Sequence, residues 1–299
     1  MIEVKNLRKN FGSFNALDDL CLHVKKASIY GLVGPNGAGK TTLIKHLAGI
    51  FRQDQGTISI KGSNISNNQE MKKNIIYIPD ELYFFSQYTI QEMAGFYAAL
   101  YPSWSWERFA ALKQVFPIET KRRITRLSKG MQRQAAFWLG ISVRPEIMIL
   151  DEPVDGLDPV MRKQVWNLVL QDVAEREMTV LISSHNLREL EDVCDHVGIL
   201  YQGKIVAEKE LDDLKSDIHK LQVAFSGDIP ENFLQDFQVL HKTQKGSILQ
   251  VIVRGLPELI LFQVEKTNPL LVDMLPLTLE EIFIYELGGM GYEIREVLI

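Results

Sequence analysis

One stretch of nine residues constrains the fold of this chain more than any other. Residues 34–42 read Gly-Pro-Asn-Gly-Ala-Gly-Lys-Thr-Thr, which fits the pattern Gly-x-x-x-x-Gly-Lys-Thr in every specified position. An apolar run typical of a strand, 28–33, precedes it, and a helix-like stretch, 41–48, follows it. A strand, a glycine-rich turn and a helix N-terminus together present clustered backbone N–H groups, which favour a bound phosphate.

We therefore expect this loop to bind the phosphates of a nucleoside triphosphate. Lys40 is expected to reach the β- and γ-phosphates, and the Thr41 hydroxyl to help hold Mg²⁺. The alternative is a glycine-rich turn that binds nothing, and the correct flanks on both sides argue against it. The loop does not tell what the energy of the triphosphate is used for. The other residues expected to bind nucleotide are Gly34, Pro35, Asn36, Gly37, Ala38, Gly39 and Thr42.

The composition is that of an ordinary globular protein and excludes several classes. Of the 299 residues, 46% are hydrophobic and 24% charged, and the net charge of −5 provides no basic field for nucleic acid. No stretch has the roughly 18 consecutive apolar residues of a membrane span, and the N-terminus lacks the apolar region of a signal peptide. We expect Cys21 and Cys194 to be two buried, unpaired thiols in a cytosolic protein.

The alternation of strands and helices predicts two domains. Residues 1–215 alternate short apolar strands with helical stretches, which predicts an α/β layered core. Within it, 86–145 is mostly helical and predicts a helical subdomain, in which Thr89 opens a helix with a capping box. Residues 216–299 predict a small α+β accessory domain such as a ferredoxin-like one, with the charged stretch 211–217 as the junction. The strands expected in the core are 2–4, 20–24, 29–33, 57–60, 75–78, 147–150, 180–183, 197–200 and 205–207.

A pair of acidic residues ends one of these strands. Residues 148–152 read Met-Ile-Leu-Asp-Glu. Asp151 is expected to belong to the Mg²⁺ shell, as carboxylates do in such sites. Glu152 follows at the same strand end and can polarise an attacking water. His185 follows the strand 180–183.

Two further motifs mark helix starts. Residues 127–132 read Leu-Ser-Lys-Gly-Met-Gln and open a helix, where the Ser128 hydroxyl and the Gly130 N–H can form a second anion-binding surface. Residues 155–158 read Asp-Gly-Leu-Asp, and Asp158 is the predicted cap of a helix that begins at Pro159.

Together these motifs resemble those of the ATP-binding subunit of ABC (ATP-binding-cassette) transporters, over residues 1–212. Many ATPases share the phosphate loop, but the signature Ser128–Gln132 ahead of Asp151 and Glu152 is specific to this family. The resemblance implies a P-loop NTPase fold, ATP hydrolysis, and ATP and Mg²⁺ as cofactors. It also implies a head-to-tail dimer, in which each ATP lies between one chain's phosphate loop and the other chain's signature helix.

The resemblance also implies roles for single residues. Phe11 corresponds to the aromatic residue that stacks on adenine, for which a place in the core is the alternative. Glu152 corresponds to the general base, and His185 to the residue that contacts the γ-phosphate and positions the water. Asp158 corresponds to the residue that couples the two sites, although its capping role alone would account for it.

The chain departs from the family pattern in two places. After the strand 75–78, where the family usually has a glutamine, this chain has Pro79-Asp80-Glu81. An ionised Asp80 only accepts hydrogen bonds and would be repelled by Mg·ATP unless it touches the metal or its water, so we expect a metal-shell ligand. In the signature, Lys129 replaces a glycine and Met131 a glutamine, while the anion-binding Ser128 and Gly130 remain.

The expected function is ATP hydrolysis that powers a separately encoded membrane permease, an exporter of a drug, peptide or lipid-like substrate. Asp80-Glu81, the Ser-Lys-Gly-Met signature and 279–284 resemble bacterial exporter-type and Ytr-like subunits. The expected partners are the permease, which would contact the aromatic-rich stretches 83–85 and 97–106, and a second ATP-binding subunit, identical or different. We expect no nucleic-acid partner and a peripheral position on the inner face of the cell membrane. The alternative is a non-transporting ABC ATPase that transmits a mechanical or regulatory signal through a membrane partner.

Overall fold

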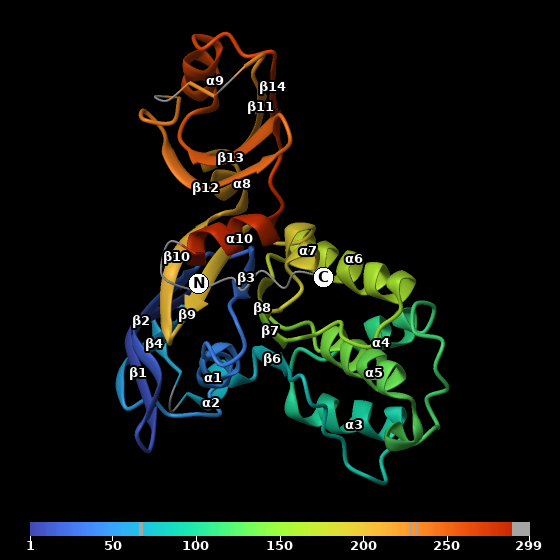
Figure 1. Ribbon diagram of the computed structural model, residues 1–299. Coiled ribbons are helices and arrows are strands. Elements are labelled where there is room, and N and C mark those ends of the chain that lie inside the picture. The colour runs from blue at the N-terminus through green and yellow to red at the C-terminus, as the bar shows by residue number, and fades with distance from the viewer. Residues whose placement is uncertain (66–67, 228, 231–232, 289–299) are drawn as a thin grey trace. The chain divides into compact units, whose positions relative to one another are not determined.

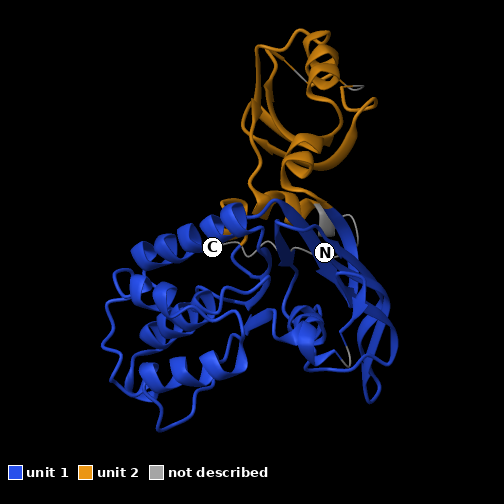
Figure 2. Cartoon of the chain, turned by 180° about the vertical axis from the view of Figure 1, so that it is seen from behind, with its two compact units in different colours: residues 1–186, 193–208 blue, residues 187–192, 209–299 orange. Residues whose placement is uncertain are grey.

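The computed structural model describes residues 1–65, 68–227, 229–230 and 233–288 (Figure 1). They form two compact units (Figure 2). The first holds residues 1–186 and 193–208, and the second holds residues 187–192 with the described residues from 209 onward. Among the described helices, none is both long and apolar enough to cross a membrane.

Two sheets build the first unit. The antiparallel sheet has the order β2-β1-β4-β5, and the larger sheet has the order β10-β9-β3-β8-β7-β6. In the larger sheet β3 pairs in parallel with β8 and β9, and β7 pairs in parallel with β6 and β8. The strands are β1 (Ile2–Phe11), β2 (Phe14–Val24), β3 (Ile29–Val33), β4 (Gln55–Ile60), β5 (Ser63–Asn64), β6 (Ile75–Ile78), β7 (Ile147–Asp151), β8 (Thr179–Ser183), β9 (His196–Tyr201) and β10 (Lys204–Glu210).

The strands β3, β7 and β8 are buried along their whole length, which explains why the sequence shows continuous apolar runs there instead of alternation. Helix α1 (Lys40–Leu47) contributes Leu43, Ile44 and Leu47 to the same core as Leu20 of β2 and Leu32 of β3. This shared core fixes the start of α1 at the carboxyl end of β3, where ligands bind in open α/β sheets.

Helices fill the rest of the first unit. Helices α4 (Trp106–Leu112) and α5 (Lys129–Ser142) pack through aromatic rings, because Trp138 of α5 stacks on Phe109 of α4 at 4.8 Å between ring centroids. The predicted capping box is confirmed, because Thr89 Oγ1 accepts from the Glu92 N–H at 3.2 Å and the Glu92 side chain accepts from the Thr89 N–H at 2.8 Å. These helices are α2 (Gln69–Lys72), α3 (Ile90–Leu100), α4 (Trp106–Leu112), η1 (Ile124–Arg126), α5 (Lys129–Ser142) and α6 (Pro159–Arg176).

The second unit contains an antiparallel sheet with the order β12-β13-β11-β14. Its core consists of residues such as Leu221, Val251 and Val264. The charged stretch 211–217, the predicted junction, forms helix α8, in which Leu211 and Leu214 are buried. The elements are α7 (Leu187–Glu191), α8 (Leu211–Asp217), β11 (Ile218–Ala224), β12 (Gln238–Lys245), β13 (Ile248–Arg254), α9 (Pro257–Glu265), β14 (Leu271–Leu275) and α10 (Leu279–Gly288).

The predicted fold class, an α/β core with a helical subdomain and a small α+β part, is confirmed. Two finer expectations are wrong. Cys21 is exposed instead of buried, although both thiols are free as predicted. The strands expected at 2–4 and 20–24 are longer, because they pair with each other over most of β1 and β2.

Candidate active site

The glycine-rich loop joins β3 to α1 and depends on its glycines. Gly39 has a φ of 111°, and a Cβ atom there would lie 2.7 Å from the backbone oxygen of Ala16. A side chain is therefore excluded both by backbone conformation and by the close approach of another strand. The glycines that define the motif are required for the turn itself.

Lys40, at the start of α1, is buried and lies over its own loop. Its Nζ donates to the backbone oxygens of Gly34 at 2.7 Å and Pro35 at 3.3 Å. Burial lowers the pKa of the Lys40 ammonium, while the charges of Glu152 and Asp151 act in the opposite direction. The ammonium group of Lys40 therefore lies at the loop, next to the N-terminus of α1. The helix dipole favours an anion at the same place.

Asp151, at the end of β7, brings the loop and the central sheet together. Its carboxylate is buried, and Oδ1 accepts a hydrogen bond from Ser183 Oγ of β8. The same oxygen lies 3.4 Å from the Thr41 hydroxyl. Two of the three residues expected to hold a metal, Thr41 and Asp151, are thus in direct contact.

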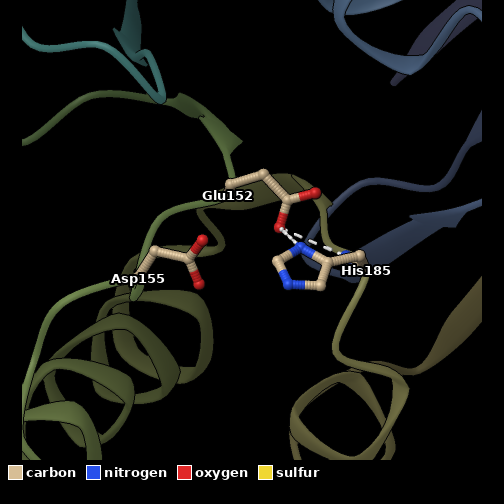
Figure 3. Close-up of side chains that lie close together, drawn as sticks. All are labelled: Glu152, Asp155 and His185. Atoms are coloured by element: carbon tan, nitrogen blue, oxygen red, sulfur yellow. Dashed lines mark hydrogen bonds and ion pairs between the residues drawn. The ribbon is translucent and has the colours of Figure 1, made fainter. Parts of the chain in front are cut away.

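Glu152 and His185 form the second half of the site (Figure 3). The backbone N–H of His185 donates to Glu152 Oε2 at 3.2 Å, and the ring Nδ1 lies 2.8 Å from the same oxygen. Glu152 has a φ of 45°, a left-handed conformation that is unusual for glutamate and is often retained at functional sites. Side-chain ligand atoms of Glu152, Asp155 and His185 lie within 4.8 Å of one another, and no motif predicts a role for Asp155.

The signature motif stands at the start of α5. Ser128 caps the helix by accepting from the Met131 N–H at 3.3 Å, and Ser128 and Lys129 are both exposed. A Cβ atom on Gly130 would lie 2.6 Å from the backbone oxygen of Gly156, so the loop 155–158 excludes a side chain there. Figure 1 shows α5 among the helices of the subdomain and α1 in a different part of the unit.

The remaining expected site residues lie at element ends. Asp158 accepts from the N–H groups of Val160 and Met161 at 3.0 Å each, which confirms it as the cap of α6. Phe11, at the tip of β1, is 46% exposed, so its alternative as a core residue is wrong. Asp80 is exposed, and its carboxylate lies 3.4 Å from Arg133, a residue for which no motif predicts a role.

Comparison with known proteins places this architecture in a family. The sequence model described as ABC transporter matches residues 17–155. The ABC transporter ATP-binding protein YtrB of Bacillus subtilis (strain 168) is 32% identical over 97% of this chain and 99% of its own length. The bacitracin transport ATP-binding protein BcrA of Bacillus licheniformis is 36% identical over 72% of this chain and 71% of its own length.

Solved structures of other proteins support the same family. A structure of an ATP-binding subunit of an ABC transporter superposes with a TM-score of 0.68 at 28% identity, covering 72% of this chain and 92% of that chain. A dimeric bacterial ABC transporter cassette superposes with a TM-score of 0.65 at 20% identity, over 71% of this chain and 99% of that chain, and shows the shared fold. This chain belongs to the family of ABC transporter ATP-binding proteins. Its core is a P-loop NTPase fold, and it is an ATPase that binds ATP.

Proposed function

We propose that this protein hydrolyses ATP to power a separately encoded membrane permease that exports a drug, peptide or lipid-like substrate. The names of two relatives support export of such a substrate. BcrA is a bacitracin transport protein, and LnrL of Bacillus subtilis (strain 168), 31% identical over 78% of this chain, is a linearmycin resistance protein. The protein would then act at the inner face of the cell membrane, bound to the permease.

The contact between Glu152 and His185 carries the proposed mechanism. Glu152 would accept a proton from a water that attacks the γ-phosphate, and general base catalysis of this kind contributes about 10²–10⁴-fold. The backbone N–H of His185 donates to the carboxylate, and the ring Nδ1 lies against the same oxygen. The other ring nitrogen would face the γ-phosphate. Lys40 at the helix head would hold the β- and γ-phosphates.

The oxygen donors at the end of β7 suit Mg²⁺. Thr41 Oγ1 and Asp151 Oδ1 lie 3.4 Å apart, and hydroxyl and carboxylate oxygens are the ligands that this small, hard cation prefers. When bound there, Mg²⁺ would neutralise charge on the phosphates. We assign Thr41 and Asp151 to its shell, with Asp80 as a third member from the loop after β6.

The remaining roles follow from a head-to-tail dimer. Phe11 presents an exposed ring to the adenine, and such stacking contributes about 1–3 kcal/mol. The phosphates would lie on the loop Gly34, Pro35, Asn36, Gly37, Ala38, Gly39, Lys40, Thr41 and Thr42. Ser128 and Gly130 would close the partner's site from their exposed helix start, and Asp158 would couple the two sites.

The contact with the permease would use the helical subdomain. Tyr83, Phe85 and Trp106 are exposed, so these aromatic residues do not all fill the subdomain core. Residues 216–299 would form an accessory domain outside the ATP site, since no phosphate-binding motif lies there.

Replacement of Glu152 by glutamine tests the mechanism. The amide keeps the shape but cannot accept the proton, so Glu152→Gln should lower ATP turnover by about 10²–10⁴-fold and let ATP hold a stable dimer. Turnover and size-exclusion chromatography with Mg·ATP measure both effects. The matched control is Glu175→Gln on α6, because Glu175 is exposed and bonded to Gln171. Full turnover in Glu152→Gln would refute the assignment of the base.

A further inference from the structure

One buried side chain of the signature helix holds the loop after β6. The guanidinium of Arg133 on α5 donates to the backbone oxygens of Pro79 at 2.8 Å and Asp80 at 2.9 Å. It also lies 3.4 Å from Oδ1 of the Asp80 carboxylate. The Arg133 side chain is only 7% exposed, whereas that of Asp80 is 55% exposed. A planar guanidinium that bonds two successive carbonyl groups fixes the loop in one position relative to α5.

The charge of Arg133 matters as much as its hydrogen bonds. Two carbonyl oxygens accept from its N–H groups, and the Asp80 carboxylate adds an opposite charge nearby. A cleft of about 670 Å³ beside this contact is lined by the carboxylates of Asp80, Glu81 and Asp155 and by the cations Lys129 and Arg133. Lys129 is exposed, so water screens its attraction for the nearby carboxylates. Arg133 is buried, so its attraction for Asp80 is screened less than that of Lys129.

This contact bears on the unusual residue at position 80. The phosphates of ATP keep net negative charge even with Mg²⁺ bound, so a carboxylate beside them is repelled unless its charge is offset. A neutral glutamine has no such requirement. In this chain the carboxylate at position 80 and the cation that faces it come from different elements, the loop after β6 and helix α5.

We propose that Arg133 is a positioning residue for Mg·ATP. It holds the backbone at Asp80 and offsets the charge of the Asp80 carboxylate. The loop can then face the Mg²⁺ ion that Thr41 and Asp151 would hold. Through the same contact, the position of the loop depends on the signature helix. The inference rests on the proposed function, in particular on Asp80 as a member of the metal shell.

Equilibrium binding of a fluorescent ATP analogue to the full-length protein, at a series of Mg²⁺ concentrations, tests the proposal. Arg133→Met removes the charge and the hydrogen bonds but keeps the apolar stem. It should weaken Mg²⁺-dependent binding about tenfold, the loss expected when hydrogen bonds from a charged group are removed. Arg133→Lys keeps the charge without the planar fork and should remain within about threefold of the unchanged protein. If Arg133→Met does not fold, Arg133→Lys and Asp80→Asn carry the test.

A matched control separates positioning from stability. Arg108 on α4 pairs with the buried carboxylate of Asp172 at 3.1 Å, so Arg108→Met removes another arginine ion pair of the first unit and should lower thermal stability without changing the Mg²⁺ dependence. Hydrogen exchange without nucleotide adds a readout that does not use activity. In Arg133→Met, the amides of Asp80, Glu81 and Leu82 should exchange faster, while those of β7 stay protected.

The double variant Asp80→Asn/Arg133→Met decides between positioning and a purely structural role. If Arg133 acts through Asp80, the double variant should bind the ATP analogue no more weakly than the single variant with the lower affinity. The proposal is overturned if the losses multiply, or if Arg133→Met loses stability while its Mg²⁺ dependence is unchanged. Failure of the unchanged protein to bind the analogue would instead refute the proposed function.

Discussion

Two loops at the carboxyl edge of the same sheet flank the candidate site, and different parts of the chain hold them. The loop after β6 carries Asp80 and is bonded by Arg133 of α5, in the same compact unit. The loop after β8 carries His185 and continues directly into α7, which belongs to the second unit together with Asp192. The two loops are alike in origin, because each follows a buried strand of the parallel sheet.

Within the second unit, polar contacts hold α7. The Glu191 carboxylate accepts from the N–H of Leu279, the first residue of α10, at 3.1 Å, and pairs with Lys215 of α8 at 2.7 Å. Arg188 pairs with Glu280 at 3.6 Å. The comparison teaches that the loop with Asp80 is held by the signature helix. The loop with His185 is continuous with a helix that belongs to the second unit.

The largest effect is expected from the loop after β8. His185→Ala removes the ring from Glu152 and should lower the turnover number by about 10²–10³-fold, since a correctly placed base accounts for rate factors of this size. Binding of the ATP analogue should change little. The control is His23→Ala, which removes an exposed histidine from β2. A loss of binding with unchanged turnover would reverse the roles assigned to the two loops.

An intermediate effect is expected from removal of residues 218–299. The truncated chain keeps the phosphate loop, Asp151 and Glu152, so it should still bind ATP. It loses α10, which packs against α7, and His185 would then lead into a helix without its partner. Turnover should fall about tenfold, because small displacements of a catalytic group are costly. Binding and turnover of the truncated protein, with its thermal transition as a control of folding, measure this.

Loss of ATP binding in a folded truncated protein would show that the second unit contributes to the ATP site itself. Unchanged turnover would show that α7 holds its position without α10. Either result would remove the distinction drawn between the two loops.

Much of the site could be predicted from the sequence because its determinants are local. The turn at residues 34–42 needs glycines that the chain itself supplies, and the caps at Thr89 and Asp158 are formed within one helical turn. The strand ends at Asp151 and Ser183 follow from continuous apolar runs. In each case the pattern and the contact lie within a few residues of each other.

The parts that could not be predicted depend on contacts between distant segments. Arg133 meets Asp80 across 53 residues, and Glu191 meets Leu279 across 88 residues. Nothing in the periodicity of the sequence assigns α7 to the second unit, because its partners come much later in the chain. The strand β14 was likewise not predicted. Its sequence, Leu-Val-Asp-Met-Leu, lacks a regular alternation of apolar and polar residues, and the strand is half-exposed.

The smallest effect is expected from two single changes next to α7. Glu191→Ala leaves the Leu279 N–H without its acceptor at the start of α10, which costs about 1 kcal/mol, and should lower turnover about twofold to threefold. Lys215→Met keeps that hydrogen bond and loses a partly exposed ion pair, worth about 0–1 kcal/mol, so turnover should stay unchanged. Steady-state turnover and thermal unfolding of both variants measure the difference. If both variants lose stability equally and turnover falls in neither, the α7–α10 contact does not act on His185. Any effect of the truncation on turnover would then need another route to the site.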